Sequence, residues 1–171
     1  MARTKVKCGS GIEKEGTNRH LVLIDVENIA GTPCPTPIEL ASVEQGLRQA
    51  IEDLGETHCV VACSHRAART VAFSFPRALR RWRSGVDGAD LALLEEMSDL
   101  RVMQRYGRVT VCSGDGIFAK SLAALAEAGV ETTVVSRPSS LSARLKLSAQ
   151  HVVPLADKGT TDPTAEFGEA S

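Results

Sequence analysis

Short apolar runs alternate along this chain with segments of helical periodicity, and this alternation limits the folds that it can adopt. The runs occupy residues 21–26, 58–63, 108–112, 130–135 and 151–155. The first, LVLIDV, is apolar on both sides of the strand, which is typical of a parallel sheet covered by helices on both faces. The pattern predicts an α/β fold: a Rossmann-like three-layer sandwich around a central, mostly parallel sheet of five or six strands. The sixth strand is expected near residues 79–83.

Helices are expected between the strands. Val43, Leu47, Ala50 and Leu54 fall at helical spacing, and Gly55 follows where a helix would end. The other predicted helices begin near residue 66 or span about 88–105, 116–128 and 139–149. Helical connections of this kind join parallel strands, which supports the same fold class.

The length and composition are those of one ordinary globular domain. The chain has 171 residues, is 43% apolar and carries a formal charge of −1. Its polar ends, residues 1–19 and 157–171, are predicted to be disordered, which leaves one folded domain over residues 20–156. We find no apolar run of the roughly 20 residues that a membrane span needs, and no secretion signal. Five cysteines without framework spacing indicate reduced thiols, so we expect a cytoplasmic protein with no membrane partner.

Positive charge is concentrated in one stretch of the chain. Between Glu56 and Asp87 there is no acidic residue, and this stretch contains six arginines: Arg66, Arg69, Arg77, Arg80, Arg81 and Arg83. One interpretation is a solvated face whose acidic partners come from elsewhere in the fold. The other is a strip that contacts phosphate groups, because the planar guanidinium matches phosphate oxygens. The sequence leaves both interpretations open.

Acidic residues follow two of the predicted strands. The first strand ends at Asp25, with Asn28 three residues later, and the 108–112 strand leads to Ser113 and Asp115. Ligands of open α/β sheets bind beyond the carboxyl ends of the strands, so these side chains would share a crevice if their strands are neighbours. Each acid alone could simply cap a helix. Together they predict a site for a hard cation, Mg²⁺ or Mn²⁺, which would offset their mutual repulsion.

Three separated segments, LVLIDVENIA, SGVDGADLALLE and VTVCSGDGIFAKSLAALAEAGVETTVVS, resemble the NYN domain of the PIN-like nuclease superfamily. The resemblance extends over about residues 20–156. It implies a Rossmann-like parallel fold, a divalent metal held by acidic residues, and cleavage of RNA. By position, Asp25 and Asn28 match the D-x-x-N of the family's first strand, and Asp87 matches its mid-chain acid. Asp115 matches the first Asp of the S-G-D-x-D-F signature.

The chain departs from this signature at Ile117, where the family usually has a second Asp. Isoleucine cannot bind a metal, so one implied ligand is missing. We hypothesise that Asp90 supplies a fourth acid from the opposite wall of the site. The alternatives are a site that is weakened to one metal, and a site that is inactive and retained for RNA binding.

The resulting hypothesis is a metal-dependent ribonuclease. Its predicted catalytic residues are Asp25, Asn28, Asp87 and Asp115, its metal ligands Asp25, Asp87, Asp90 and Asp115, and its RNA contacts Arg66, Arg80, Arg81, Arg83 and Ser113. The alternative functions are a catalytically inactive RNA-binding or adaptor module and a small-molecule phosphatase with an aspartate nucleophile. The class of RNA, the biological role and the formation of a homo-oligomer are left open by the sequence.

Overall fold

The computed structural model describes residues 19–156, except for the side chains of residues 100 and 101. The two end segments that the sequence predicts to be disordered lie outside the described residues, apart from Arg19.

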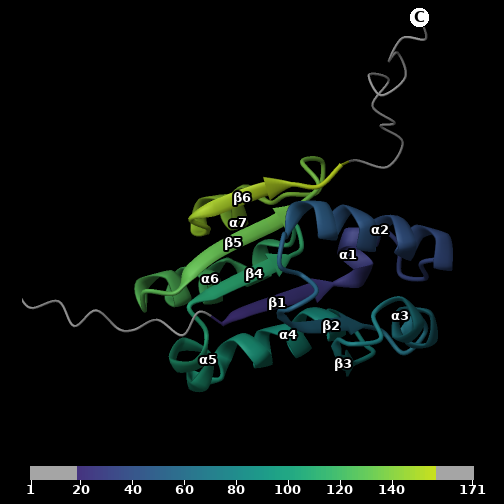
Figure 1. Ribbon diagram of the computed structural model, residues 1–171, viewed down its shortest axis with the longest axis horizontal. Helices are drawn as coiled ribbons and strands as arrows, with labels where there is room; N and C mark the ends of the chain where they lie inside the picture. The colour runs from purple at the N-terminus through teal and green to yellow at the C-terminus, as the bar shows by residue number, and fades with distance from the viewer. Residues whose placement is uncertain (1–18, 157–171) are drawn as a thin grey trace, which may run out of the picture.

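Six strands form one sheet in which every neighbouring pair is parallel (Figure 1). The strands are β1 (His20–Asp25), β2 (His58–Cys63), β3 (Leu79–Trp82), β4 (Arg108–Cys112), β5 (Glu131–Ser136) and β6 (His151–Pro154). Their order across the sheet is β3-β2-β1-β4-β5-β6. The predicted α/β fold with a parallel sheet is confirmed, including its short sixth strand.

Helices cover both faces of this sheet. They are α1 (Val26–Ala30), α2 (Pro37–Ala50), α3 (Ala68–Ser74), α4 (Gly88–Ser98), α5 (Leu100–Arg105), the 3₁₀ turn η1 (Gly116–Phe118), α6 (Ala119–Glu127) and α7 (Ala143–Ser148). One apolar cluster packs α4, α5, α6 and α7 against one face, and a second packs α1, α2 and α3 against the other. Figure 1 shows α2 in front of the sheet, with α4 and α6 behind it.

Four helices differ from their predicted ranges. The first of them, α2, ends at Ala50, before the Leu54 and Gly55 that the sequence analysis placed at its end. The helix predicted over 88–105 is divided at Asp99, whose backbone is extended with ψ 115°. The helix predicted over 116–128 begins as the 3₁₀ turn η1. The last helix begins only at residue 143, because the Ser142 amide donates to the Gly114 carbonyl at 2.9 Å and so belongs to a tertiary contact.

The sheet has its topological switch point between β1 and β4. From β1 the chain builds β2 and β3 on one side, and it then returns to place β4, β5 and β6 on the other. The connections on the two sides run over opposite faces, so a crevice is expected at the carboxyl ends of β1 and β4. Within residues 19–156, every helix is too short or too polar to span a membrane.

A buried polar network holds the opposite, amino-terminal edge of the sheet. His20 Nδ1 lies 3.0 Å from Asp53 Oδ1, and His20 Nε2 lies 2.8 Å from Thr110 Oγ1. Arg108 Nη2 donates to Asp53 Oδ2 at 2.7 Å. This Thr–His–Asp arrangement resembles a hydrolytic triad. Thr110, however, is 97% buried within β4, and the backbone amides of this strand are hydrogen-bonded to the neighbouring strands. They therefore cannot stabilise an oxyanion. The network is therefore structural.

This network predicts sensitivity to acid. Burial lowers the pKa of His20 below 6.5, with Asp53 acting in the opposite direction. The unfolded chain therefore binds a proton at this residue more readily than the folded protein, and stability falls as pH falls below about 6.5. In urea unfolding at pH 5.5 and 7.5, we expect a His20→Gln variant to lose less stability between the two pH values than the wild type. An equal loss in both proteins would assign the acid sensitivity to other groups.

Candidate active site

An acidic cavity of about 240 Å³ opens at the carboxyl edge of the sheet. It lies where β1 meets α1, beside the end of β2 and the first turn of α4. The lining residues include five acids and three polar or basic side chains: Asp25, Glu27, Asp87, Asp90, Asp115, Asn28, Ser64 and Arg83. The structure thus brings together all four acids and the asparagine that the sequence analysis proposed for the site.

Asp25 is the most buried acid of the cavity, with 3% of its surface exposed. It ends β1 and caps α1, since its Oδ1 accepts from the Asn28 amide at 3.2 Å. Its Oδ2 accepts from the Ser113 hydroxyl at 2.9 Å. Burial and then the negative charge of Asp90 raise the pKa of Asp25 to about 7, against the opposing effect of its two hydrogen bonds.

Asp90, in the first turn of α4, lies within hydrogen-bonding reach of the carboxyl group of Asp25, in the same cavity. Burial also raises the pKa of Asp90, and the negative charges of Asp115, Asp87 and Glu27 add to this effect. The contact with Asp25 opposes it. Two carboxyl groups in such contact cannot both be charged at low cost, so without a cation the pair holds a proton near neutral pH.

Ser113 and Asn28 connect the ends of β1 and β4. The Ser113 hydroxyl donates to Asp25 and accepts from the Asp115 amide at 3.1 Å, and the Asn28 side-chain oxygen accepts from the Gly114 amide at 2.8 Å. Asp115 Oδ1 accepts from the Ile117 amide at 2.9 Å and so caps η1. Ser113 is fully buried, so its hydroxyl orients Asp25 and is not available to RNA.

Asp87 precedes α4 in a left-handed backbone conformation, with φ 54°. Within the described chain it is the only residue other than glycine with a positive φ. Its carboxylate is exposed and makes no capping hydrogen bond to α4, so the simple helix-cap interpretation does not apply to it. A residue other than glycine in this conformation raises the free energy of the folded protein by about 1–3 kcal/mol. Such residues cluster at functional sites.

The arginines between Glu56 and Asp87 divide into residues that form ion pairs and residues that do not. Arg81 Nε and Arg83 Nη1 each lie 2.5 Å from a glutamate of α4, Glu96 and Glu95 respectively. For these two arginines the partners do come from elsewhere in the fold, and Arg83 is also the one that lines the cavity.

The remaining predicted RNA contacts lie outside the cavity. Arg80 donates only to backbone carbonyls, and Arg66 is exposed, with no partner among the described residues. Trp82 packs against the apolar core and is not a surface aromatic.

Three features of the site were not found by sequence reasoning. Glu27 Oε1 accepts from the Ser64 amide at 2.9 Å, which ties the end of β2 to α1. The Ser64 hydroxyl is buried beside the cavity and has no partner within the described part of the chain. Ile117 packs against the core behind η1 and is not among the cavity-lining residues. No sequence signal marks Ser64, whereas Glu27 could have been noticed two residues after Asp25.

The cavity fits a divalent cation in its donor chemistry. No group of three or more Asp, Glu, His or Cys side chains within residues 19–156 is arranged as a ready metal site. Mg²⁺, however, typically takes only one or two protein carboxylates and keeps several waters. The Asp25–Asp90 pair supplies two hard oxygen donors whose repulsion a cation would relieve, and the unpaired Ser64 hydroxyl is a ready partner for a water molecule.

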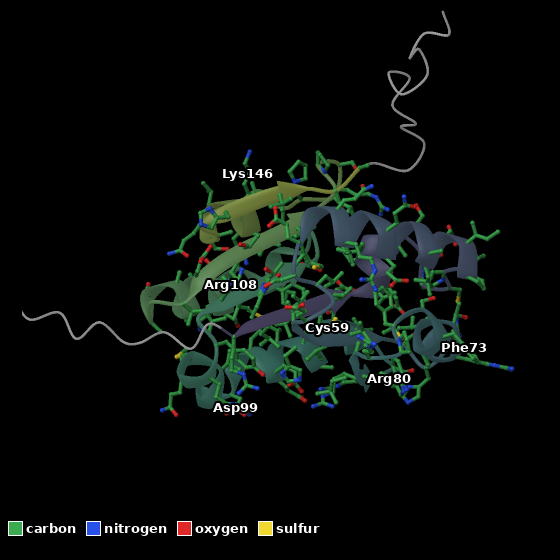
Figure 2. All side chains as sticks on the ribbon, in the orientation of Figure 1. Cys59, Phe73, Arg80, Asp99, Arg108 and Lys146 are labelled. Atoms are coloured by element: carbon green, nitrogen blue, oxygen red, sulfur yellow. The ribbon has the colours of Figure 1, made fainter. Side chains whose placement is uncertain are left out.

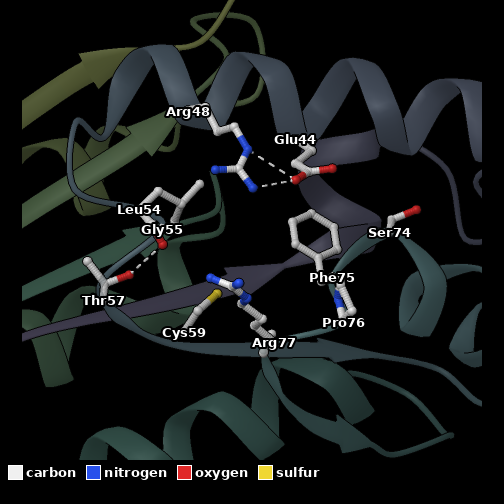
Figure 3. Close-up of a pocket in the computed structure, with 11 residues that line it drawn as sticks. Glu44, Arg48, Leu54, Gly55, Thr57, Cys59, Ser74, Phe75, Pro76 and Arg77 are labelled. Carbon is white, nitrogen blue, oxygen red and sulfur yellow. Dashed lines mark hydrogen bonds and ion pairs between the residues drawn. The ribbon is translucent and has the colours of Figure 1, made fainter.

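A second cavity, of about 190 Å³, lies between α2, the start of β2 and the segment after α3 (Figure 3). Figure 3 shows the Arg48–Glu44 ion pair, 2.7 Å long, and the Thr57 hydroxyl donating to the Leu54 carbonyl. Burial raises the pKa of the Cys59 thiol to about 12, so this cysteine is not a nucleophile at neutral pH. The acidic cavity is therefore the candidate active site.

Comparisons with known proteins bear on the family and the fold of the chain. The family model of the NYN domain matches residues 19–156. A solved structure of a protein of unknown function from Vibrio parahaemolyticus has the same fold, with a TM-score of 0.56 and 14% sequence identity. The alignment covers 85% of this chain and 98% of that one. A search of curated proteins gave no match.

Proposed function

The chain belongs to the NYN domain family, whose members have a nuclease-like fold, and we propose that it is a metal-dependent ribonuclease that hydrolyses phosphodiester bonds. The observation that carries this proposal is the Asp25–Asp90 carboxyl pair, held in a cavity at the switch point of a parallel sheet. RNA as the partner and the cytoplasm as the location, both expected from the sequence, belong to the same proposal.

In this proposal Asp25 and Asp90 hold Mg²⁺ or Mn²⁺. When bound, such a cation offsets the charge of a phosphate and activates water. Asp115 and Asp87 line the same cavity, where their carboxylates orient water. Asp90 thereby provides the acid that the family signature would otherwise have at position 117.

The other side chains of the cavity position these acids and the substrate. Ser113 and the Asn28 amide fix the orientation of the Asp25 carboxyl group, and the Asn28 side chain holds the Gly114 loop in place. Arg83 faces the cavity and engages Glu95 through Nη1, which leaves its other N–H groups for a phosphate oxygen. In the hydrolysis a water oxygen bonds to phosphorus, the bond to the 3′ oxygen breaks, and that oxygen leaves with a proton.

A pair of neighbouring variants tests this assignment. We expect Asp90→Asn to lower RNA cleavage by about 100-fold or more, because it removes one of the two carboxylates proposed to hold the cation. Asp87→Asn should cost only about ten-fold, the scale of a residue that acts from outside the first ligand shell, and asparagine tolerates its left-handed backbone. The measurement is the cleavage rate of 5′-labelled single-stranded RNA with Mn²⁺, with an EDTA control.

Ile117 cannot bind a metal, and this favours one alternative: an RNA-binding module without activity. In that case the labelled RNA would remain intact with Mn²⁺ and yet shift on a native gel. Cleavage that persists at the wild-type rate in Asp90→Asn, or in EDTA, would contradict the metal-dependent mechanism.

A further inference from the structure

An aromatic side chain lies exposed among arginines on the outer surface of α3. Phe73 is 79% exposed, and Arg66, Arg69 and Arg80 are exposed as well. We call these four residues the α3 face. The segment that carries it begins two residues after Ser64, which lines the acidic cavity.

Helix geometry and one pair of hydrogen bonds place these side chains together. Arg69 lies four residues before Phe73 on α3, so these two side chains project from the same side of the helix, and Arg66 lies in the turn that precedes the helix. Arg80 Nη2 donates to the carbonyls of Ala72 and Pro76 at 3.3 and 3.2 Å, which fixes its guanidinium at the carboxyl end of α3. Figure 2 shows Phe73 and Arg80 near one another at the same end of the molecule.

The positive charge of the α3 face is not neutralised by the protein. Arg66 and Arg69 make no ion pair or hydrogen bond within residues 19–156, and Arg80 contacts only neutral carbonyls. Arg81 and Arg83, by contrast, are neutralised by Glu96 and Glu95. The unpaired charges are thus concentrated around the aromatic ring.

Exposure alone would not distinguish Phe73. Ile38 and Leu147 are 83% and 86% exposed, and single apolar side chains are ordinary on protein surfaces. Phe73 differs because its ring has a π face and because cationic side chains flank it. Proteins that bind single strands combine these two features, a stacking surface for bases and positive charge for the backbone.

We propose that the α3 face binds a single strand of RNA, with Phe73 stacked on a base and Arg66, Arg69 and Arg80 in contact with phosphates. This inference rests on the proposed function, because it assigns to the RNA substrate a binding surface outside the acidic cavity. The link between the two is the chain itself: Arg66 follows Ser64, which lines the cavity together with Asp25 and Asp90. The surface favours unpaired bases, since a duplex has no free base face to offer to Phe73.

The test compares variants of Phe73 in their binding of a short, unstructured uridine oligonucleotide, measured by fluorescence anisotropy in EDTA. Stacking on an aromatic ring contributes about 1–3 kcal/mol per base, so Phe73→Ala should weaken binding by roughly 5- to 150-fold. Phe73→Leu should lose as much, because it retains apolar surface but no ring. Phe73→Tyr should bind like the wild type, and Ile38→Ala is the matched control. Arg69→Ala should reduce the slope of log affinity against log salt concentration by about 1, the amount expected for one lost phosphate contact.

Equal affinity of Phe73→Ala and the wild type would overturn the inference, and so would an equal weakening of binding to duplex RNA. Cleavage of the same RNA with Mn²⁺ is measured in parallel. Metal-dependent cleavage by the wild type together with unchanged binding by Phe73→Ala would overturn the α3 face and leave the proposed nuclease intact. Binding that depends on the Phe73 ring, without any cleavage, would support the α3 face and overturn the nuclease.

Discussion

Replacing Asp25 by asparagine is expected to abolish RNA cleavage and, at the same time, to stabilise the metal-free protein at pH 8. The loss of cleavage follows because the variant lacks a carboxylate of the pair proposed to hold the cation. The gain in stability follows because the native carboxyl group is 3% exposed and lies against Asp90. An asparagine amide can donate a hydrogen bond to the Asp90 carboxylate, whereas in the wild type two negative charges repel each other at this position.

The sign of the pH effect comes from the raised pKa of Asp25. The folded protein keeps the Asp25 proton up to about pH 7, whereas the unfolded chain releases it near pH 3.8. The stability that this proton provides is complete below pH 3.8 and is lost as pH rises toward 7. A pKa of about 7 in place of 3.8 corresponds to roughly 4 kcal/mol, so the wild type carries a penalty of this order at pH 8 that the variant lacks.

Thermal unfolding in EDTA measures this effect. At pH 8 we expect the midpoint of Asp25→Asn to exceed that of the wild type by roughly 8–16 °C, and at pH 4 the difference should nearly vanish. Added Mg²⁺ should raise the midpoint of the wild type at pH 8 but not that of the variant. Glu52→Gln, which removes an exposed carboxylate, is the control. A variant less stable than the wild type at pH 8 would show that Asp25 is not a source of repulsion.

The sequence was sufficient to predict the parallel sheet because β1 is apolar on both sides, which is typical of a doubly covered sheet, and because the apolar runs alternate with helical segments. It also predicted that Asp25 and Asp115 follow strands. Whether these acids meet depends on the order of the strands, which apolar runs do not encode. The structure places β1 beside β4, and this neighbourhood brings Asp25 and Ser113 within 2.9 Å.

The division of roles among the acids required the structure. Asp87 and Asp90 share a helix face only if the helix has begun at Asp87, and α4 begins one residue later. Asp87 therefore stands outside the helix on a left-handed backbone, while Asp90 turns toward Asp25. The glutamates that neutralise Arg81 and Arg83 lie on α4, more than ten residues away in sequence, so no local pattern could indicate them.

Gly114→Ala is expected to be the most disruptive small substitution in the site. A Cβ built on Gly114 would lie 2.2 Å from the Ser140 carbonyl oxygen and 2.7 Å from its carbon. Both are backbone atoms of the segment before α7, so the contact cannot be relieved by rotation of a side chain. Either that segment or the end of β4 must move.

Such a movement would break two hydrogen bonds that hold the site. The Gly114 amide donates to the Asn28 side chain at 2.8 Å, and its carbonyl accepts from the Ser142 amide. We expect Gly114→Ala to lower the free energy of unfolding by about 3–5 kcal/mol, the range of severe single substitutions.

Urea unfolding measures this loss, and Gly55→Ala is the matched control, since a Cβ there would meet only Arg48 Nη1 at 3.8 Å. Because the steric conflict lies between the loop after β4 and the loop before α7, folded Gly114→Ala protein should also lose RNA cleavage while Gly55→Ala retains it. Equal stability of the two variants would show that these loops yield readily. The hydrogen bonds of Gly114 with Asn28 and Ser142 would then not be what fixes the geometry of Asp25 and Asp115.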